Sequence, residues 1–352
     1  MSPFGNVSLR WSLALIAGAI AATITGCQSM LEESAEVADV EDDLALEPEA
    51  IPLLAGQSTL AFTSPSGLIA STGNLYWTST QIEKSGPAGS TVWRASKSSV
   101  PGNEVALYGE VGDDTRFGAI VYANPGTYYG YFVANYAGAG GFTSQIKRVP
   151  LDGGPAVVIA TSPAPIQNRD LVTDQTKLFW VDAGGIRSVP LAGGTVTTVR
   201  ASSVITRLRV EGAYLYYGEE FLIFRKPKAG GPEGVMVSTS GRVTALHVDA
   251  AGGRLYWGED GGGVRSTTLA PGGPQVTYQG SIAGRVVTSV GWDGTRVLWT
   301  DCVQPAVSCR VIKKQGVITQ ILSSGGIGVG HLQWDAASLY WGDAGLLRKF
   351  VY

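Results

Sequence analysis

The sequence is poor in the side chains that most often carry chemistry. Its 352 residues include only two histidines (His247 and His331), three cysteines and three methionines. It has no G-x-S-x-G, H-E-x-x-H or P-loop motif, so the commonest esterase, zinc-protease and nucleotide-binding signatures are excluded. Basic residues form no run and the formal net charge is −3, which speaks against nucleic acid as a partner. We expect no cofactor and no metal site.

Long stretches of helical periodicity are also missing after residue 50. Glycine, in contrast, is abundant with 48 residues, and its clusters fall between short apolar runs, where turns belong. This pattern predicts an all-β protein.

An aromatic pair recurs along the chain and defines an internal repeat. The copies are Tyr76-Trp77, Tyr131-Phe132, Phe179-Trp180, Tyr216-Tyr217, Tyr256-Trp257, Leu298-Trp299 and Tyr340-Trp341. Successive copies lie 37 to 55 residues apart, and a period near 40 in an all-β chain is typical of four-stranded propeller blades. The seven copies predict a seven-bladed β-propeller of four-stranded antiparallel blades over residues 51–352.

Repetition has a physical cause in such a fold. A single blade has apolar side chains on both faces and buries them only by packing against its neighbours in a closed ring. The tryptophans of the aromatic pairs should therefore fill the space between blades. Two acids recur as well: one before the second strand (Asp174, Glu211, Asp249, Asp293, Asp335) and one after the pair (Asp182, Glu219, Glu259, Asp301, Asp343). We interpret them as turn formers and hydrogen-bonding partners between blades, rather than as paired catalytic carboxylates.

The last copy of the repeat is incomplete. It stops at Tyr352 after a third strand, whereas the run from Gly56 to Phe62 precedes the first copy with nothing to pair with. We expect this N-terminal run to close the ring as the missing strand of the last blade.

Three segments carry a family resemblance. "LYWTST" at Leu75, "VLWTDC" at Val297 and "LYWGD" at Leu339 resemble the YWTD repeats of low-density-lipoprotein-receptor propellers, and less closely NHL blades. The first copy departs from the pattern, with Ser79 where the acid belongs, and receptor YWTD propellers have six blades instead of seven. The resemblance implies the fold; it implies neither the receptor function nor a catalytic set.

The N-terminus resembles a bacterial lipoprotein signal. An apolar run of about 14 residues follows Arg10, which suits a signal peptide better than a membrane span, and it ends in the lipobox-like "ITGC". The resemblance implies a signal peptide over 1–26, cleavage after Gly26, and acyl chains on Cys27 that anchor the protein to the membrane. The alternative is an uncleaved anchor or an ordinary secretory signal.

The segment 27–50 has the composition of a tether. Residues 28–50 contain nine carboxylates and no lysine or arginine, so the chain there should stay extended and solvated. Gln28 after the lipidated cysteine favours the outer over the inner membrane. We therefore expect an exported, lipid-anchored cell-envelope protein.

The two remaining cysteines form an even pair in an exported chain. Cys302 and Cys309 bracket a short loop between the second and third strands of blade 6, which predicts a disulfide rather than a metal site.

Variable loops indicate where a partner would bind. The turns between third and fourth strands are uniform and rich in glycine, whereas long, varied loops lie on the opposite face in blades 1 and 2. Recognition usually resides in such loops, although long loops are also tolerated without a role. The candidate partner-binding residues are Glu83, Lys84, Asp113, Asp114, Arg116 and Tyr136, with His331 at the channel mouth.

These observations favour a monomeric binding or scaffold module for a protein, peptide or glycan. One alternative is a lactonase- or lyase-like enzyme with its site over the central channel, and another is a purely structural envelope protein. The fold alone does not decide among the three.

Overall fold

The computed structural model describes residues 57–61, 65–81, 89–98, 101–112, 115–124, 128–138, 141–162, 164–166, 170–304, 308–326, 330–343 and 346–352. Within these residues every regular element is a β-strand. None of them forms a helix long and apolar enough to cross a membrane. The predicted signal peptide, Cys27 and the acidic tether lie outside the described residues.

The strands form seven four-stranded antiparallel sheets. Blade 1 consists of β2 (Gly67–Ala70), β3 (Asn74–Gln81), β4 (Gly89–Ser96) and β5 (Val105–Val111). Blade 2 consists of β6 (Thr115–Ala123), β7 (Tyr129–Gly138), β8 (Gly141–Pro150) and β9 (Val157–Ser162). Blade 3 consists of β10 (Leu171–Thr173), β11 (Lys177–Asp182), β12 (Gly185–Pro190) and β13 (Thr197–Ala201).

The second half of the ring repeats the same order of strands. Blade 4 consists of β14 (Ile205–Glu211), β15 (Tyr214–Glu219), β16 (Leu222–Pro227) and β17 (Gly234–Ser238). Blade 5 consists of β18 (Val243–Asp249), β19 (Arg254–Glu259), β20 (Val264–Thr268) and β21 (Val276–Gln279). Blade 6 consists of β22 (Arg285–Trp292), β23 (Val297–Val303), β24 (Ser308–Gln315) and β25 (Ile318–Gly326). Blade 7 consists of β26 (Leu332–Trp334), β27 (Ser338–Asp343), β28 (Leu346–Val351) and β1 (Gln57–Ala61).

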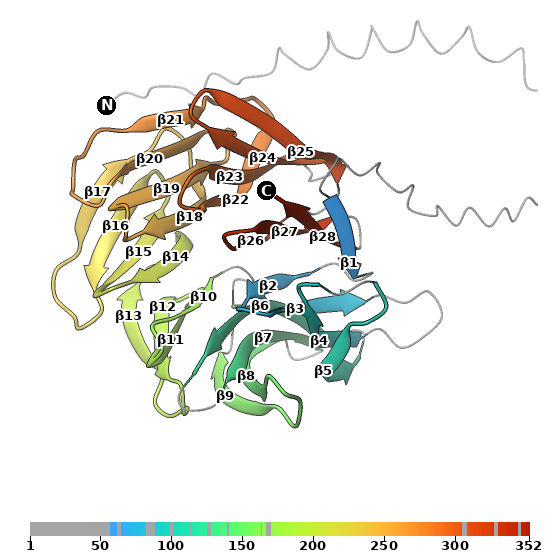
Figure 1. Cartoon of the computed structure of the whole chain (residues 1–352). Helices are drawn as coiled ribbons and strands as arrows, with labels where there is room; N and C mark the ends of the chain where they lie inside the picture. Colours follow the sequence, from blue (N-terminus) through green and yellow to red (C-terminus); the bar gives the residue numbers. More distant parts are fainter. Residues whose placement is uncertain are drawn as a thin grey trace, which may run out of the picture. The chain divides into compact units, whose positions relative to one another are not determined.

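The blades are arranged around a central axis, with the first strand of each blade innermost (Figure 1). The ring is closed as the sequence predicts, because β1 pairs antiparallel with β28 and is the outer strand of blade 7. The seven-bladed all-β propeller and its closure by an N-terminal strand are both confirmed.

The aromatic pair recurs because its two members serve two different blade interfaces. Neighbouring residues of a strand point to opposite faces of the sheet. Trp257 accordingly packs in a cluster with residues of blade 4, such as Ile223, whereas the adjacent Tyr256 packs with residues of blade 6, such as Trp299. The buried core consists of seven such clusters, each spanning one seam between blades. The tryptophans of the aromatic pairs are core residues, as predicted.

The acid that follows the aromatic pair links neighbouring blades. In blades 3 to 7 it accepts a hydrogen bond from a side chain at the end of the preceding blade. The contacts are Ser162 to Asp182 (3.3 Å), Ser202 to Glu219 (2.8 Å), Ser240 to Glu259 (3.0 Å), Gln279 to Asp301 (3.0 Å) and Ser323 to Asp343 (3.1 Å). The predicted interblade role is confirmed for these five acids.

The acid before the second strand shapes a turn. Asp174, Asp293 and Asp335 each accept backbone N–H bonds from residues two and three positions further on. Two of them also form ion pairs across seams, since Asp335 meets Lys97 of blade 1 at 2.6 Å and Asp174 meets Lys228 of blade 4 at 2.7 Å. The Lys97 pair joins the last blade to the first.

Blade 2 lacks the recurring acid, and its seam with blade 1 uses a different one. The Glu110 carboxylate accepts hydrogen bonds from Tyr108 at 2.6 Å and Tyr136 at 2.8 Å, and it forms an ion pair with Lys147. These three donors outweigh the effect of burial, so the pKa of Glu110 is lowered from its usual value. Cys302 and Cys309 form the predicted disulfide in blade 6.

Candidate functional site

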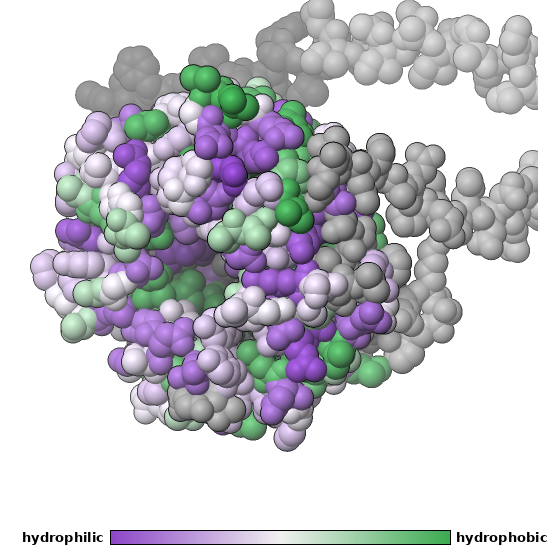
Figure 2. Space-filling model, in the orientation of Figure 1, coloured by the Kyte–Doolittle hydropathy of each residue, from purple (hydrophilic) through white to green (hydrophobic). Residues whose placement is uncertain are grey.

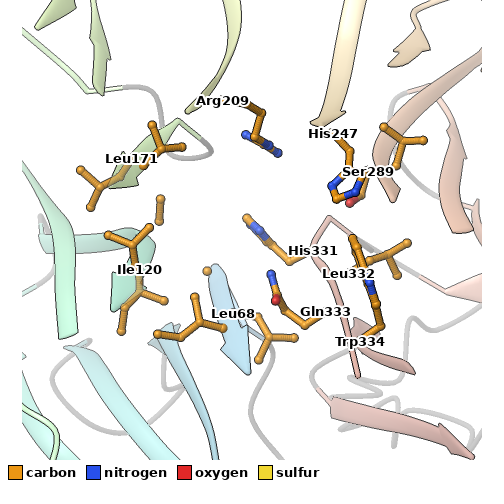
Figure 3. Close-up of a pocket in the computed structure, with 16 residues that line it drawn as sticks. Leu68, Ile120, Leu171, Arg209, His247, Ser289, His331, Leu332, Gln333 and Trp334 are labelled. Atoms are coloured by element: carbon orange, nitrogen blue, oxygen red, sulfur yellow. The ribbon is translucent and has the colours of Figure 1, made fainter. Parts of the chain in front are cut away.

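The central channel holds a cavity of about 210 Å³ to which all seven blades contribute (Figure 3). Its lining residues come from or directly precede the innermost strands β2, β6, β10, β14, β18, β22 and β26. Figure 2 shows the hollow in the middle of the ring, where hydrophobic and hydrophilic residues meet. The channel is therefore a site that only the complete ring creates.

Three polar side chains of the channel share one register position. On each innermost strand, one residue pairs with the first member of the aromatic pair. From blade 1 to blade 7 these residues are Ile69, Val121, Val172, Arg209, His247, Gly291 and Gln333. Blades 1 to 3 present aliphatic side chains there, whereas blades 4, 5 and 7 present polar ones. One wall of the channel is thus apolar and the other is polar.

The polar wall contains a cationic group that faces the cavity. The Arg209 side chain is 34% exposed, and its guanidinium points into the channel (Figure 3). Arg209 Nη1 donates to the Leu208 carbonyl at 2.7 Å and lies 3.9 Å from Asp170 Oδ1. Burial lowers the pKa of Arg209, an effect that the Asp170 carboxylate opposes. The exposed third of this side chain faces an enclosed channel rather than open solvent.

A second arginine shares the same carboxylate. Arg207 Nη1 lies 3.9 Å from Asp170 Oδ2, and Asp170 is fully buried and accepts the Leu208 N–H at 3.1 Å. The guanidinium of Arg207 also donates to the carbonyls of Thr206 and Thr244. The two arginines and one carboxylate leave one net positive charge beside the cavity.

His247 is held as a neutral imidazole on the polar wall. Its ring contacts Trp334 edge-on at 5.2 Å between centroids and lies 6.1 Å from the ring of Tyr256. Burial, and then the charge of Arg209, lower the pKa of His247 to about 4. Gly291 makes this packing possible, because a Cβ atom there would lie 2.1 Å from the Trp334 ring.

His331 lies directly before β26 and lines two cavities of the channel. One is the main cavity, and the other is a smaller one of about 70 Å³ that it shares with Arg207 and Ser289. Arg207, Ser289 and His331 precede the register position above, toward the face where the blades are connected. The cationic part of the channel therefore opens on the face of the blade connections.

Two of the other predicted binding residues are described, and neither of them lines this cavity. Arg116 is exposed at the start of β6, and the Tyr136 hydroxyl is engaged by Glu110 in the seam between blades 1 and 2. Glu83, Lys84, Asp113 and Asp114 lie outside the described residues. Among the residues that are described, no three His, Cys, Asp or Glu side chains are grouped so that they could hold a metal ion.

Sequence reasoning identified His331 but missed Arg209, Ser289 and Gln333 as channel residues. A sequence signal for these residues exists in the position they occupy relative to the aromatic pair. Once the blades are aligned on the aromatic pair, the residue opposite its first member changes from aliphatic to polar between blade 3 and blade 4. Such a change at an otherwise equivalent position marks the polar wall.

Comparison with known proteins supports the fold alone. No family model and no curated protein sequence matches the chain. Among solved structures, the chain is similar to the extracellular domain of a putative one-component system from B. thetaiotaomicron, with a TM-score of 0.60 and 14% identity. The match covers 86% of this chain but spans only 40% of the length of that chain. The comparisons thus support the propeller fold and do not test the resemblance to YWTD repeats.

Proposed function

We propose that the protein is a binding module of the cell envelope, which acyl chains on Cys27 hold at the membrane. The partner is a protein, peptide or glycan that docks on the face of the blade connections. The observation that carries this proposal is the convergence of Arg209, His331 and Gln333 on a cavity that opens toward this face. Binding sites are typically concave and mostly apolar, with a few convergent polar groups.

The rim around the channel belongs to the same proposal. Arg116 is exposed at the start of β6, next to the connection that contains Asp113 and Asp114, and it shares this face with the channel mouth. Glu83, Lys84 and Tyr136 complete the proposed rim. The similar solved structure is itself an extracellular domain, which is in keeping with an exported binding module.

Site-specific crosslinking tests the proposed face. A photoreactive amino acid replaces Arg116 on the connection face or Asp152, an exposed residue of a turn on the opposite face, in two versions of the full chain. Irradiation of intact cells should yield a defined crosslinked partner from position 116 and none from position 152. Equal crosslinking from both faces, or no defined product from position 116, contradicts the proposal.

A further inference from the structure

The two walls of the channel differ in chemistry, which restricts what fits between them. Ile69, Val121 and Val172 line the cavity at the shared register position of blades 1 to 3, opposite the polar residues of blades 4 to 7. A ligand that satisfies both walls has an apolar body and one polar end. The volume of about 210 Å³ limits its size, since a dry cavity of roughly 150 Å³ takes up benzene.

The polar wall favours an anionic end. Arg209, Ser289 and Gln333 offer guanidinium, hydroxyl and amide donors to the cavity, and the Arg209 guanidinium suits the planar, two-oxygen geometry of a carboxylate. Within the described part of the chain, the hydrogen bonds of Arg209 involve only Nη1. The remaining guanidinium nitrogens make no hydrogen bond to the described residues, and the guanidinium points into the cavity.

The charge balance favours one negative charge over two. Two arginines flank the fully buried carboxylate of Asp170, each at 3.9 Å, so that these three described groups together carry one net positive charge. A monoanion neutralises this charge, whereas a dianion would add repulsion from Asp170 in a poorly solvated site.

From these observations we propose that the channel binds a ligand with a single carboxylate, which pairs with Arg209 while its apolar body packs against Ile69, Val121 and Val172. This inference rests on the proposed function, because it names the ligand class of the same face. The carboxylate belongs either to a small free acid or to the C-terminus of a peptide.

The chain provides its own reporter for the test. It contains only two histidines, and both line the cavity. The imidazole ¹H–¹⁵N spectrum of the full chain in detergent therefore reports on the channel directly, and His331→Asn assigns the two signals. Hexanoate is the probe. Hexanamide, which has the same carbon chain but no charge, is the control.

We expect hexanoate to shift both imidazole signals in a saturable way and hexanamide to leave them in place. Arg209→Gln should weaken hexanoate binding about 10- to 100-fold, the loss expected for a charged hydrogen-bonded pair. Arg242→Gln, which removes an equal charge from an exposed position at the start of blade 5, should leave binding unchanged. If Arg209→Gln does not fold, Arg209→Lys is the second variant. It keeps the positive charge but cannot form two parallel hydrogen bonds to a carboxylate, so it should still weaken hexanoate binding.

Additional ligands in the same experiment identify the source of the carboxylate and the number of negative charges that the channel accepts. A short apolar peptide with a free C-terminus, compared with its amidated form, distinguishes a chain end from a free acid. Equal binding of hexanamide, or tighter binding of the dianions glutarate or inorganic phosphate, overturns the proposal. If crosslinking shows a partner on the connection face but no carboxylate shifts the histidine signals, the binding function stands and the carboxylate inference fails.

Discussion

The seams between blades and the central channel are built from the same strands, but they differ in how regular they are. At the seams, an acid after the aromatic pair accepts a hydrogen bond from the preceding blade in five successive blades. In the channel, one register position changes from Val172 in blade 3 to Arg209 in blade 4 and His247 in blade 5. Residues that repeat serve the fold here, and residues that break the repeat mark a candidate site.

The largest effect should come from opening the ring. Deleting residues 51–62 removes β1, so that the edge of β28 loses its partner and blade 7 keeps three strands. We expect the free energy of unfolding to fall by about 5 kcal/mol or more, and the melting temperature by about 8 °C or more. Deleting residues 28–50 is the matched control and should leave the melting temperature unchanged. Equal melting temperatures for the two truncations would show that closure does not hold the ring together.

The next largest loss of stability should follow from the substitution of one acid at a seam between blades. Asp301 is fully buried and accepts hydrogen bonds from Arg285 at 2.6 Å and from Arg310 at 2.6 and 2.8 Å. Asp301→Ala leaves two guanidinium groups without their counterion and should cost about 3–5 kcal/mol of unfolding free energy. Gln333→Ala in the channel should cost less than about 1 kcal/mol. Denaturant unfolding measures both, and similar losses would remove the distinction between seam and channel.

The smallest effect concerns the pH dependence of stability. The unfolded chain protonates His247 near its ordinary pKa of 6.5, whereas the folded protein does so only near pH 4. Between these values the unfolded state binds more protons, so His247 reduces stability progressively as the pH falls from 6.5 toward 4, by about 3 kcal/mol in all. His247→Gln lacks this penalty.

The measurement is the difference in unfolding free energy between wild type and His247→Gln at pH 7 and at pH 4.5. We expect the wild type to lose stability relative to the variant as the pH is lowered. A difference that stays constant with pH would mean that the imidazole remains accessible to protons in the folded state.

The fold was readable from the sequence because its determinants recur. One aromatic pair, such as Tyr256-Trp257, would be ambiguous, but seven copies near a period of 40 leave few architectures open. The seam between blades 1 and 2 was not foreseen, because Glu110 lies on the outer strand β5 and stands outside the repeated pattern. Loop length likewise drew attention to Tyr136, which the structure places in that seam.

The channel was harder to foresee for a topological reason. Arg209, His247 and Gln333 belong to three blades and lie far apart in the chain, and they meet only when the ring closes. Each looks like an ordinary strand residue within its own blade. Their common register becomes visible only when the innermost strands are compared position by position.

The pairing of β1 with β28 also determines how the molecule bears load. Among the described strands, β1 comes first in the chain and lies at the edge of blade 7, where it pairs with β28; Gln57 also links it to blade 6 by donating to the Leu322 carbonyl. A pull on residues before Gln57 therefore acts first on the ladder to β28 and on the Gln57 contact with blade 6. The strand that closes the ring is thus also the first strand to bear a load applied through the N-terminal segment.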